Sequence, residues 1–191
     1  VRQLRWDLGS QNSLVIHLTL VPYIAAAGEL KTKPTQNSVK SLLSYGVQPD
    51  IVVCRTEYEL GESIKRKVAL FCNIQPEQVI QSIDAASIYE VPLLMKKERL
   101  DEVVIDRLKL NNFQEPDLAG WEGFLNRLQK PKSSVRIGLI GKYVELKDAY
   151  KSIAEAFVHA GAQLECKVNI SWIHSESLHE DNIEDKLHSL N

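Results

Sequence analysis

The chain has 191 residues, 44% of them hydrophobic and 25% charged, with a formal net charge of −2. This apolar share supports a folded core of one domain, or of one domain and part of another, and excludes a wholly disordered chain. Twenty-three basic residues against twenty-five acidic ones give no general basic field, so unspecific coating of nucleic acid is excluded and any anion site has to be local.

The beginning of the chain has a helical pattern of apolar residues, Val1, Leu4 and Leu8, which Gly9 ends. There is no initiator Met and no signal-peptide pattern, so we expect the chain to begin inside a longer protein. The most apolar stretch, Leu14 to Ala27, is interrupted by polar residues and is shorter than the ~20 residues of a membrane span. No membrane partner is therefore expected.

Residues 14–108 alternate apolar strands with amphipathic helices, which predicts a parallel α/β sheet of the Rossmann type. Leu14–Val21 is almost continuously apolar, as expected for a strand covered on both faces. In the helix predicted over Glu62–Cys72, Ile64, Val68 and Phe71 are expected on one face. The other elements expected here are a short helix that stops at Gly46, strands Ile51–Cys54 and Val79–Ile83, and helices Ser87–Lys96 and Leu100–Leu108.

A polar segment with a proline, 129–134, follows the helix predicted over Leu118–Leu128 and indicates a linker. After it we expect a second unit, with strands Val135–Ile140 and Leu164–Ile173 and helices Ala149–Ala160 and Asn182–Leu190. Two strands leave faces and edges exposed, so this unit is not expected to be stable alone. The predicted division is 1–110, a helix and linker over 111–134, and 135–191.

The segment 28–40, GELKTKPTQNSVK, carries the clearest chemical signal. Lys31 and Lys33 alternate on an expected extended loop, so their ammonium groups should point to the same side, and Pro34 stiffens this loop. Three hydroxyl groups accompany them, those of Thr32, Thr35 and Ser38, and the next helix offers free backbone N–H groups. These groups suit a polyphosphate; the alternative is a solvated lysine loop.

Three further charged residues are candidate ligand-binding residues because of where they lie in the predicted elements. Lys67 is expected on the buried side of its helix, where it is either a ligand or a lysine at the edge of the core with its head group in water. Arg55 closes a strand, and the carboxyl ends of parallel strands border ligand crevices. Asp84 either caps the next helix or holds a polar group of a ligand.

No catalytic residue and no metal ligand is predicted in this chain. The histidines lack cysteine or carboxylate neighbours at the short spacing of a metal site. Cys54 and Cys72 lie in apolar runs, and no cysteine has the surroundings of a nucleophile. The three cysteines also form no disulfide framework, which suits a reducing, cytoplasmic location.

Four stretches of the sequence, residues 17–55, 65–74, 82–94 and 137–152, closely resemble the CTP synthase family, and KTKPTQ at 31–36 is highly specific to it. The resemblance implies the latter part of a P-loop amidoligase (synthetase) domain over 1–110. It also implies, over 135–191, the start of a flavodoxin-like class I glutamine amidotransferase domain. The family's enzyme uses ATP to phosphorylate the 4-oxygen of UTP, which is then replaced by ammonia released from glutamine.

The resemblance also implies roles for individual residues. The UTP triphosphate, and the inhibitor CTP at the same place, would be held by Lys31, Thr32, Lys33, Pro34, Thr35, Gln36 and Lys67. The adenine end of ATP would lie against Arg55, Ile83, Asp84 and Ala85. Binding of the activator GTP and coupling of the domains would involve Lys142, Tyr143 and Lys151.

Other parts of the family's machinery match nothing in this chain. The P-loop and the Mg²⁺ carboxylates are expected before Val1, and the glutaminase Cys–His–Glu triad after Asn191. A homotetramer is expected for the full-length protein, and no activity for this fragment alone, because phosphoryl transfer and amide hydrolysis lack their essential groups. The alternative is a non-catalytic α/β module that binds a nucleotide or a partner through the retained loop.

Overall fold

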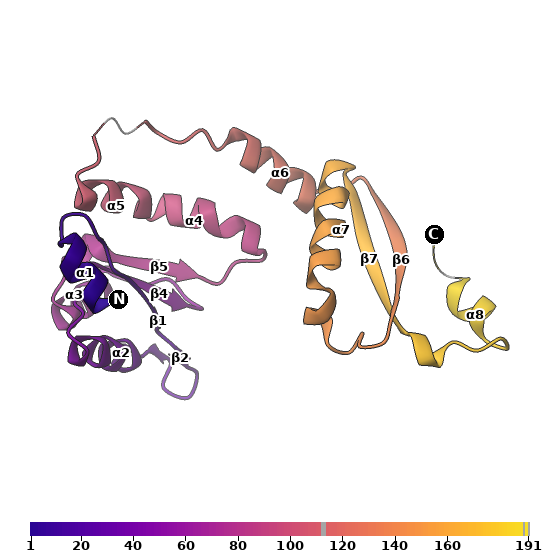
Figure 1. The fold of residues 1–191 in the computed structure, drawn as a ribbon, viewed down its shortest axis with the longest axis horizontal. Helices are drawn as coiled ribbons and strands as arrows, with labels where there is room; N and C mark the ends of the chain where they lie inside the picture. Colours follow the sequence, from indigo (N-terminus) through magenta and orange to yellow (C-terminus); the bar gives the residue numbers. More distant parts are fainter. Residues whose placement is uncertain (112–113, 189, 191) are drawn as a thin grey trace. The chain divides into compact units, whose positions relative to one another are not determined.

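The computed structural model describes residues 1–111, 114–188 and 190 (Figure 1). The chain forms two compact units, Val1–Glu115 and Pro116–Asn191, and each contains parallel β-sheet. This confirms the predicted α/β class with Rossmann-like parallel strands. The elements of the first unit are α1 (Arg2–Leu8), β1 (Ile16–Leu20), β2 (Tyr23–Ile24), β3 (Glu29–Leu30), α2 (Lys33–Ser44), β4 (Ile51–Thr56), α3 (Glu62–Cys72), β5 (Val79–Ile83), α4 (Val91–Lys97) and α5 (Leu100–Leu108).

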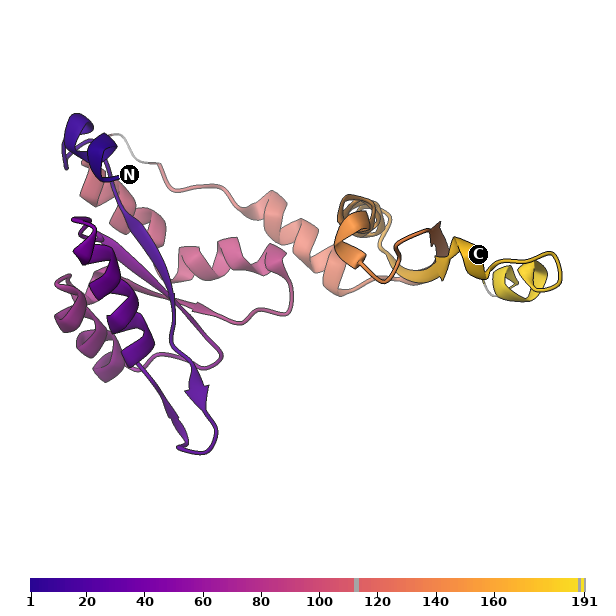
Figure 2. The same ribbon diagram turned by 60° about the horizontal axis from the view of Figure 1, so that its bottom comes forward.

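The sheet of the first unit has the strand order β1-β4-β5, and all pairs are parallel (Figure 2). Its register places Leu18 beside Val53 and Val53 beside Ile80. The three strands therefore end at one edge, where Leu20, Thr56 and Ile83 are their last residues. Ligands of open α/β sheets bind at this carboxyl edge.

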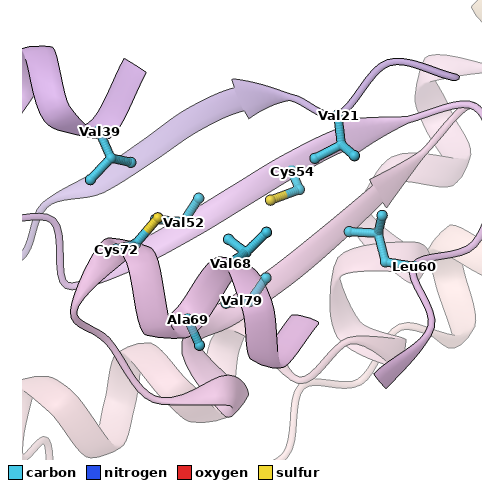
Figure 3. Packing of buried hydrophobic residues seen from close by; sticks show 9 residues of the cluster. All are labelled: Val21, Val39, Val52, Cys54, Leu60, Val68, Ala69, Cys72 and Val79. Atoms are coloured by element: carbon cyan, nitrogen blue, oxygen red, sulfur yellow. The ribbon is translucent and has the colours of Figure 1, made fainter. Parts of the chain in front are cut away.

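Helices α2 and α3 pack on one face of this sheet and enclose its main apolar core. The cluster comprises Val21, Val39, Val52, Cys54, Leu60, Val68, Ala69, Cys72 and Val79 (Figure 3). Each of the larger aliphatic side chains in it stabilises the fold by about 1.5–3 kcal/mol relative to an exposed position. The core thus fixes the two helices that carry most of the candidate ligand residues.

The opposite face is covered only in part. Leu14, with side chains of α4 and α5, packs against Ile51, Val53 and Ile80 of the central and third strands. The β1 side chains Leu18 and Leu20, on the same face, are 67% and 53% exposed. The expectation that this first strand is covered on both faces is therefore wrong, because no described helix reaches over it.

Helix α3 has the predicted bounds but a different buried face. Val68, Ala69 and Cys72 are buried, whereas Phe71 is 58% exposed. Phe71 was expected in the buried stripe; instead the apolar stripe is turned by about one residue around the axis. The helix ends where Asn73 adopts a left-handed backbone, φ 56°, and donates its N–H to the Ala69 carbonyl.

The segment between β1 and α2 is a short hairpin rather than a loop. Strands β2 and β3 pair antiparallel, and Gly28 has φ 63°, which favours glycine in this turn. The Tyr23 ring lies 4.4 Å, centroid to centroid, from the Tyr58 ring of the β4–α3 connection. The Lys31 N–H donates to the Pro22 carbonyl at 2.9 Å, and α2 begins two residues later.

The second unit contains α6 (Ala119–Gln129), β6 (Ser133–Gly141), α7 (Lys151–Gln163), β7 (Cys166–His174) and α8 (Ile183–Leu187). β6 and β7 are parallel and form a sheet of their own, against which α7 packs. Ser133 and Ser134 already pair with β7, so the strand starts inside the segment expected as a linker. In the predicted helix Asn182–Leu190, residue 189 lies outside the described residues.

Gly141, the last residue of β6, lies close to the side chain of Tyr150. A Cβ there would lie 2.2 Å from the hydroxyl oxygen of Tyr150. The ring of Tyr150 in turn lies 6.2 Å from that of Trp172 in β7. Along the described residues, no helix combines the length and the apolar character needed to cross a membrane.

Candidate functional site

The segment 31–36 joins the hairpin to α2 and separates its charged from its hydroxyl side chains. Lys31 keeps 44% of its side chain exposed, and Lys33 is exposed as the first residue of α2. Thr32 and Thr35 are buried, at 6% and 0% exposure. The predicted extended loop is thus helical from Lys33 on, because proline is well tolerated in a first helical turn.

The first turn of α2 is suited to bind an anion. It leaves backbone N–H groups without partners in the helix, and the helix dipole adds positive potential at this end. Gln36 closes the turn: its N–H donates to the Thr32 carbonyl and its side-chain amide to the Thr32 hydroxyl, both at 3.0 Å. Lys33 adds a full positive charge at the same end.

The three hydroxyl groups of this segment are bonded within the protein. Thr32 accepts from Gln36, Thr35 donates to the Leu20 carbonyl at 3.0 Å, and the Ser38 hydroxyl lies 2.9 Å from Nε2 of His17. Thr32 and Thr35 are also buried, whereas Ser38 lines the cleft at the carboxyl edge of the sheet, and a ligand role for these hydroxyls stays a prediction.

Lys67 of α3 lies within electrostatic reach of the hairpin. Glu29 of β3 forms an ion pair with Lys31, and that hydrogen bond is the main reason why the pKa of Glu29 is lowered; Lys67 contributes a smaller attraction. Lys67 itself is exposed, not on the buried side of its helix as expected. Lys31 thus pairs directly with the Glu29 carboxylate, whereas Lys67 acts on it only at longer range.

The residues matched to the adenine end also lie together. Arg55 near the end of β4 donates from Nε to Oδ1 of Asp84 at 3.3 Å, and both side chains are largely exposed. The Asp84 N–H donates to the Thr56 carbonyl at 3.0 Å, which continues the pairing of β4 with β5. Asp84 does not cap the next helix, since Ser87 accepts the N–H of Tyr89 there.

A cleft of about 680 Å³ opens at the carboxyl edge of the sheet. Its lining includes Pro34 and Ser38 of α2 together with Arg55, Glu57 and Asp84 from the ends of the other strands. The start of α2 and the Arg55–Asp84 pair thus border one space. The charged residues that line it are Arg55, Glu57 and Asp84, while Lys31 and Lys33 lie beside it in the neighbouring segment and do not line it.

A second cleft, of about 700 Å³, lies beside the start of β5 and is a weaker candidate. The basic residues that line it are bound to carboxylates: Lys65 to Glu98, Arg99 to Glu102 and Arg107 to Asp50. An anionic ligand would have to displace these partners. Arg55 of the carboxyl-edge cleft is paired in the same way, so what favours that cleft for a nucleotide is its place at the edge where open α/β sheets bind their ligands.

In the second unit, Lys142 and Tyr143 follow β6, and the Lys142 ammonium lies 5.7 Å from the centre of the Tyr143 ring. Lys151 begins α7 and is exposed. Among the described residues, no three His, Cys, Asp or Glu side chains are grouped so as to hold a metal ion.

Acid should weaken the packing of α2 on β1. Burial lowers the pKa of His17 below 6.5, so the neutral form that contacts Ser38 is favoured by folding. This contribution is complete above pH 6.5 and is lost as pH falls toward the lowered value. We expect the thermal midpoint of the chain to decrease over this range, and less so in His17→Gln. An unchanged pH profile in that variant would contradict the assignment.

Comparison with known proteins gives consistent matches. Residues 1–110 match the family model described as the CTP synthase N-terminus. Over 190 residues the chain is 60% identical to the CTP synthase of Flavobacterium johnsoniae; identity is 62% over 187 residues for Cytophaga hutchinsonii and 54% over 187 for Methanocaldococcus jannaschii. These alignments cover 98–100% of this chain but only 34–35% of each relative. The chain belongs to the CTP synthase family.

Proposed function

We propose that this chain is a central segment of a glutamine-dependent CTP synthase, a ligase of pyrimidine nucleotide biosynthesis. The whole enzyme would phosphorylate the 4-oxygen of UTP with ATP and replace the phosphate with ammonia from glutamine. This segment would bind the triphosphate of UTP, and that of the inhibitor CTP, at residues 31–36 with Lys67. The observation that carries the proposal is that the half-exposed Lys31 and the exposed Lys33 lie at the amino end of α2, beside the carboxyl-edge cleft.

The charges at this end of α2 are suited to a triphosphate. A nucleoside triphosphate carries about four negative charges and is held by several charge-assisted hydrogen bonds. Lys31, Lys33 and Lys67 would supply ammonium groups, and the exposed start of α2 would supply the backbone N–H of Lys33. When phosphate binds, Lys31 would leave the Glu29 carboxylate and bind the phosphate of the ligand in its place.

For ATP we propose contacts at the Arg55–Asp84 pair, with Ile83 and Ala85 beside it. The support is that Arg55 and Asp84 line the same cleft as Pro34 and Ser38 of α2. A guanidinium can stack on an adenine base, and an aspartate or nearby backbone groups can read its polar edge. ATP and UTP would thus approach from neighbouring strand ends, as a transfer between them requires.

Further parts of the proposal concern the whole protein. Residues 1–110 would belong to the synthetase domain, 111–134 to the interdomain helix and linker, and 135–191 to the glutamine amidotransferase domain. Lys142, Tyr143 and Lys151 would respond to GTP. The full-length protein would be a cytoplasmic homotetramer that uses Mg²⁺ with ATP. Three unpaired thiols support the cytoplasmic location.

The test compares this chain with a full-length family member in which residues 1–191 replace the corresponding segment, referred to below as the full-length chimera. With UTP, ATP, Mg²⁺ and glutamine, the chimera should form CTP, whereas the 191-residue chain should form none. Ammonia in place of glutamine should not rescue the chain, because the phosphorylation of UTP precedes the entry of ammonia.

Two results would count against the proposal. A folded chimera that forms no CTP would leave the alternative of a non-catalytic nucleotide-binding module. CTP formation by the 191-residue chain alone would contradict the assignment of the missing steps to other segments.

A further inference from the structure

We propose that Thr35 is a positioning residue: with Thr19 and the Leu20 carbonyl it forms a buried hydrogen-bonded contact that fixes α2 on β1 and so aims Lys33 at the triphosphate. The inference rests on the proposed function of residues 31–36. The inference adds one point to that function: the Thr35 side chain would act without touching the nucleotide. We call this contact the α2–β1 polar contact, and it includes Ser38 and His17.

Two short polar stripes meet in this contact. Thr35 and Ser38 are three residues apart on α2 and so share a helical face; His17 and Thr19 are two apart on β1 and share a strand face. The Thr35 hydroxyl lies 3.1 Å from the Thr19 hydroxyl and 3.0 Å from the Leu20 carbonyl. Ser38 and His17 meet at 2.9 Å one turn further along the helix.

The hydrogens of this contact can be assigned consistently. Thr35 has one hydroxyl proton, and the Leu20 carbonyl can only accept, so Thr35 donates to it. The Thr19 hydroxyl is then free to donate to Thr35, or to Sγ of Cys54 at 3.7 Å. Burial raises the pKa of Cys54 to about 11, so this sulfur is a neutral acceptor at physiological pH. Every group of the contact thus has a partner.

The surroundings make this contact specific for one placement of the helix. Thr35 is 0% and Thr19 7% exposed, and the neighbouring side chains of the same interface, such as Val39 and Val52, are apolar. Apolar packing tolerates small shifts, whereas a shifted α2 would leave the Leu20 carbonyl and two hydroxyls unsatisfied. The contact therefore fixes the rotation and height of α2.

This placement matters because Thr35 is only two residues from Lys33. Both belong to the first turn of α2, whose N–H groups face the same end. A rotation of the helix would move the Lys33 ammonium and the N–H donors together, and such displacements of about 1 Å are costly for a preorganised site. The loss would appear in the binding of UTP and CTP before it appears elsewhere.

The test uses the full-length chimera with Thr35→Val, Thr35→Ser and Thr19→Val. Valine keeps the shape of threonine and removes the hydroxyl; serine keeps the hydroxyl. We expect Thr35→Val to raise KM for UTP and the inhibition constant for CTP about five- to tenfold, with KM for ATP and kcat changed less than about twofold. Thr35→Ser should restore both constants, and Thr19→Val should shift them in the same direction but less.

Two controls separate the outcomes. Ser41→Ala removes an exposed hydroxyl from the same helix, where it bonds only to the Asn37 carbonyl, and should change none of these constants. Lys33→Ala should weaken both nucleotides in any case if residues 31–36 hold the triphosphate. If Lys33→Ala has its effect while folded Thr35→Val does not, the positioning role is wrong and the proposed function stands.

Other outcomes would overturn either the proposed function or the positioning role of Thr35. If Lys33→Ala has no effect, the proposed function itself fails. If Thr35→Val changes KM for UTP, KM for ATP and kcat alike, or if both valine variants fail to fold, Thr35 serves general stability and the positioning role is overturned. Failure of Thr35→Ser to restore the UTP constant would overturn it as well.

Discussion

Lys33→Ala in the full-length chimera is expected to weaken the binding of UTP and the binding of CTP together. Both nucleotides carry the triphosphate that this ammonium would bind from the first turn of α2. Loss of one charge-assisted hydrogen bond costs about 1.5–3 kcal/mol, which corresponds to roughly a ten- to hundredfold rise in KM for UTP and in the inhibition constant for CTP. Steady-state kinetics with each nucleotide varied in turn measures both constants.

Two controls accompany this variant. Lys40→Ala removes another exposed lysine of α2, nearly two turns away, and should leave both constants unchanged. Glutamine hydrolysis without nucleotides should also barely change, because its triad is expected in another domain. If Lys33→Ala left both UTP dependence and CTP inhibition intact, the assignment of residues 31–36 to the triphosphate would be wrong.

Asp50→Ala is expected to have the largest effect on stability. This carboxylate, 6% exposed, accepts from Arg5 of α1, Arg107 of α5 and the Val15 N–H, with distances of 2.7–2.9 Å to its closest partners. Removal of one partner from a buried ion pair costs about 3–5 kcal/mol, and here two guanidinium groups would lose theirs. Urea unfolding of the chain measures the change in the free energy of unfolding.

The contribution of Asp50 should also appear in the pH dependence of the free energy of unfolding. Burial alone would raise the pKa of Asp50, but hydrogen bonds from Arg5, Val15 and Arg107 outweigh it and hold the pKa below 3.8. A lowered pKa contributes stability that is complete above pH 3.8 and is lost as pH falls through the lowered value. Asp50→Ala should abolish this acid-dependent part, whereas Glu102→Ala, which removes the partly exposed partner of Arg99, should leave it.

Much of the first unit could be predicted from periodicity alone. The bounds of α3, Glu62–Cys72, and of β5, Val79–Ile83, are those expected, and Gly46 follows α2 as a stop signal predicts. These elements have strong patterns and clear terminating residues. The buried face of α3 was misjudged, because Leu70 and Phe71 offer apolar side chains on a second face and periodicity alone cannot choose between them.

The candidate site could be predicted only in part. The charged residues of 31–36 stood out by their type and spacing. The ends of the strands were predicted to border a ligand because open α/β sheets bind ligands at the carboxyl edge. The α2–β1 polar contact could not be found, because Thr19 and Thr35 are sixteen residues apart in sequence and no local pattern links them. Threonine and serine hydroxyls near an expected anion site are readily taken for ligands, and only the fold shows where they are already bonded.

An experimental structure of the full-length chimera with bound CTP tests the central claim most directly. The account predicts phosphate oxygens within hydrogen-bond distance, about 2.7–2.9 Å, of the Lys33 ammonium and the first-turn N–H groups of α2, with Lys31 released from Glu29. The Thr35 hydroxyl should remain on the Leu20 carbonyl. A triphosphate bound elsewhere, with the Lys31–Glu29 pair intact and Lys33 in solvent, would contradict it.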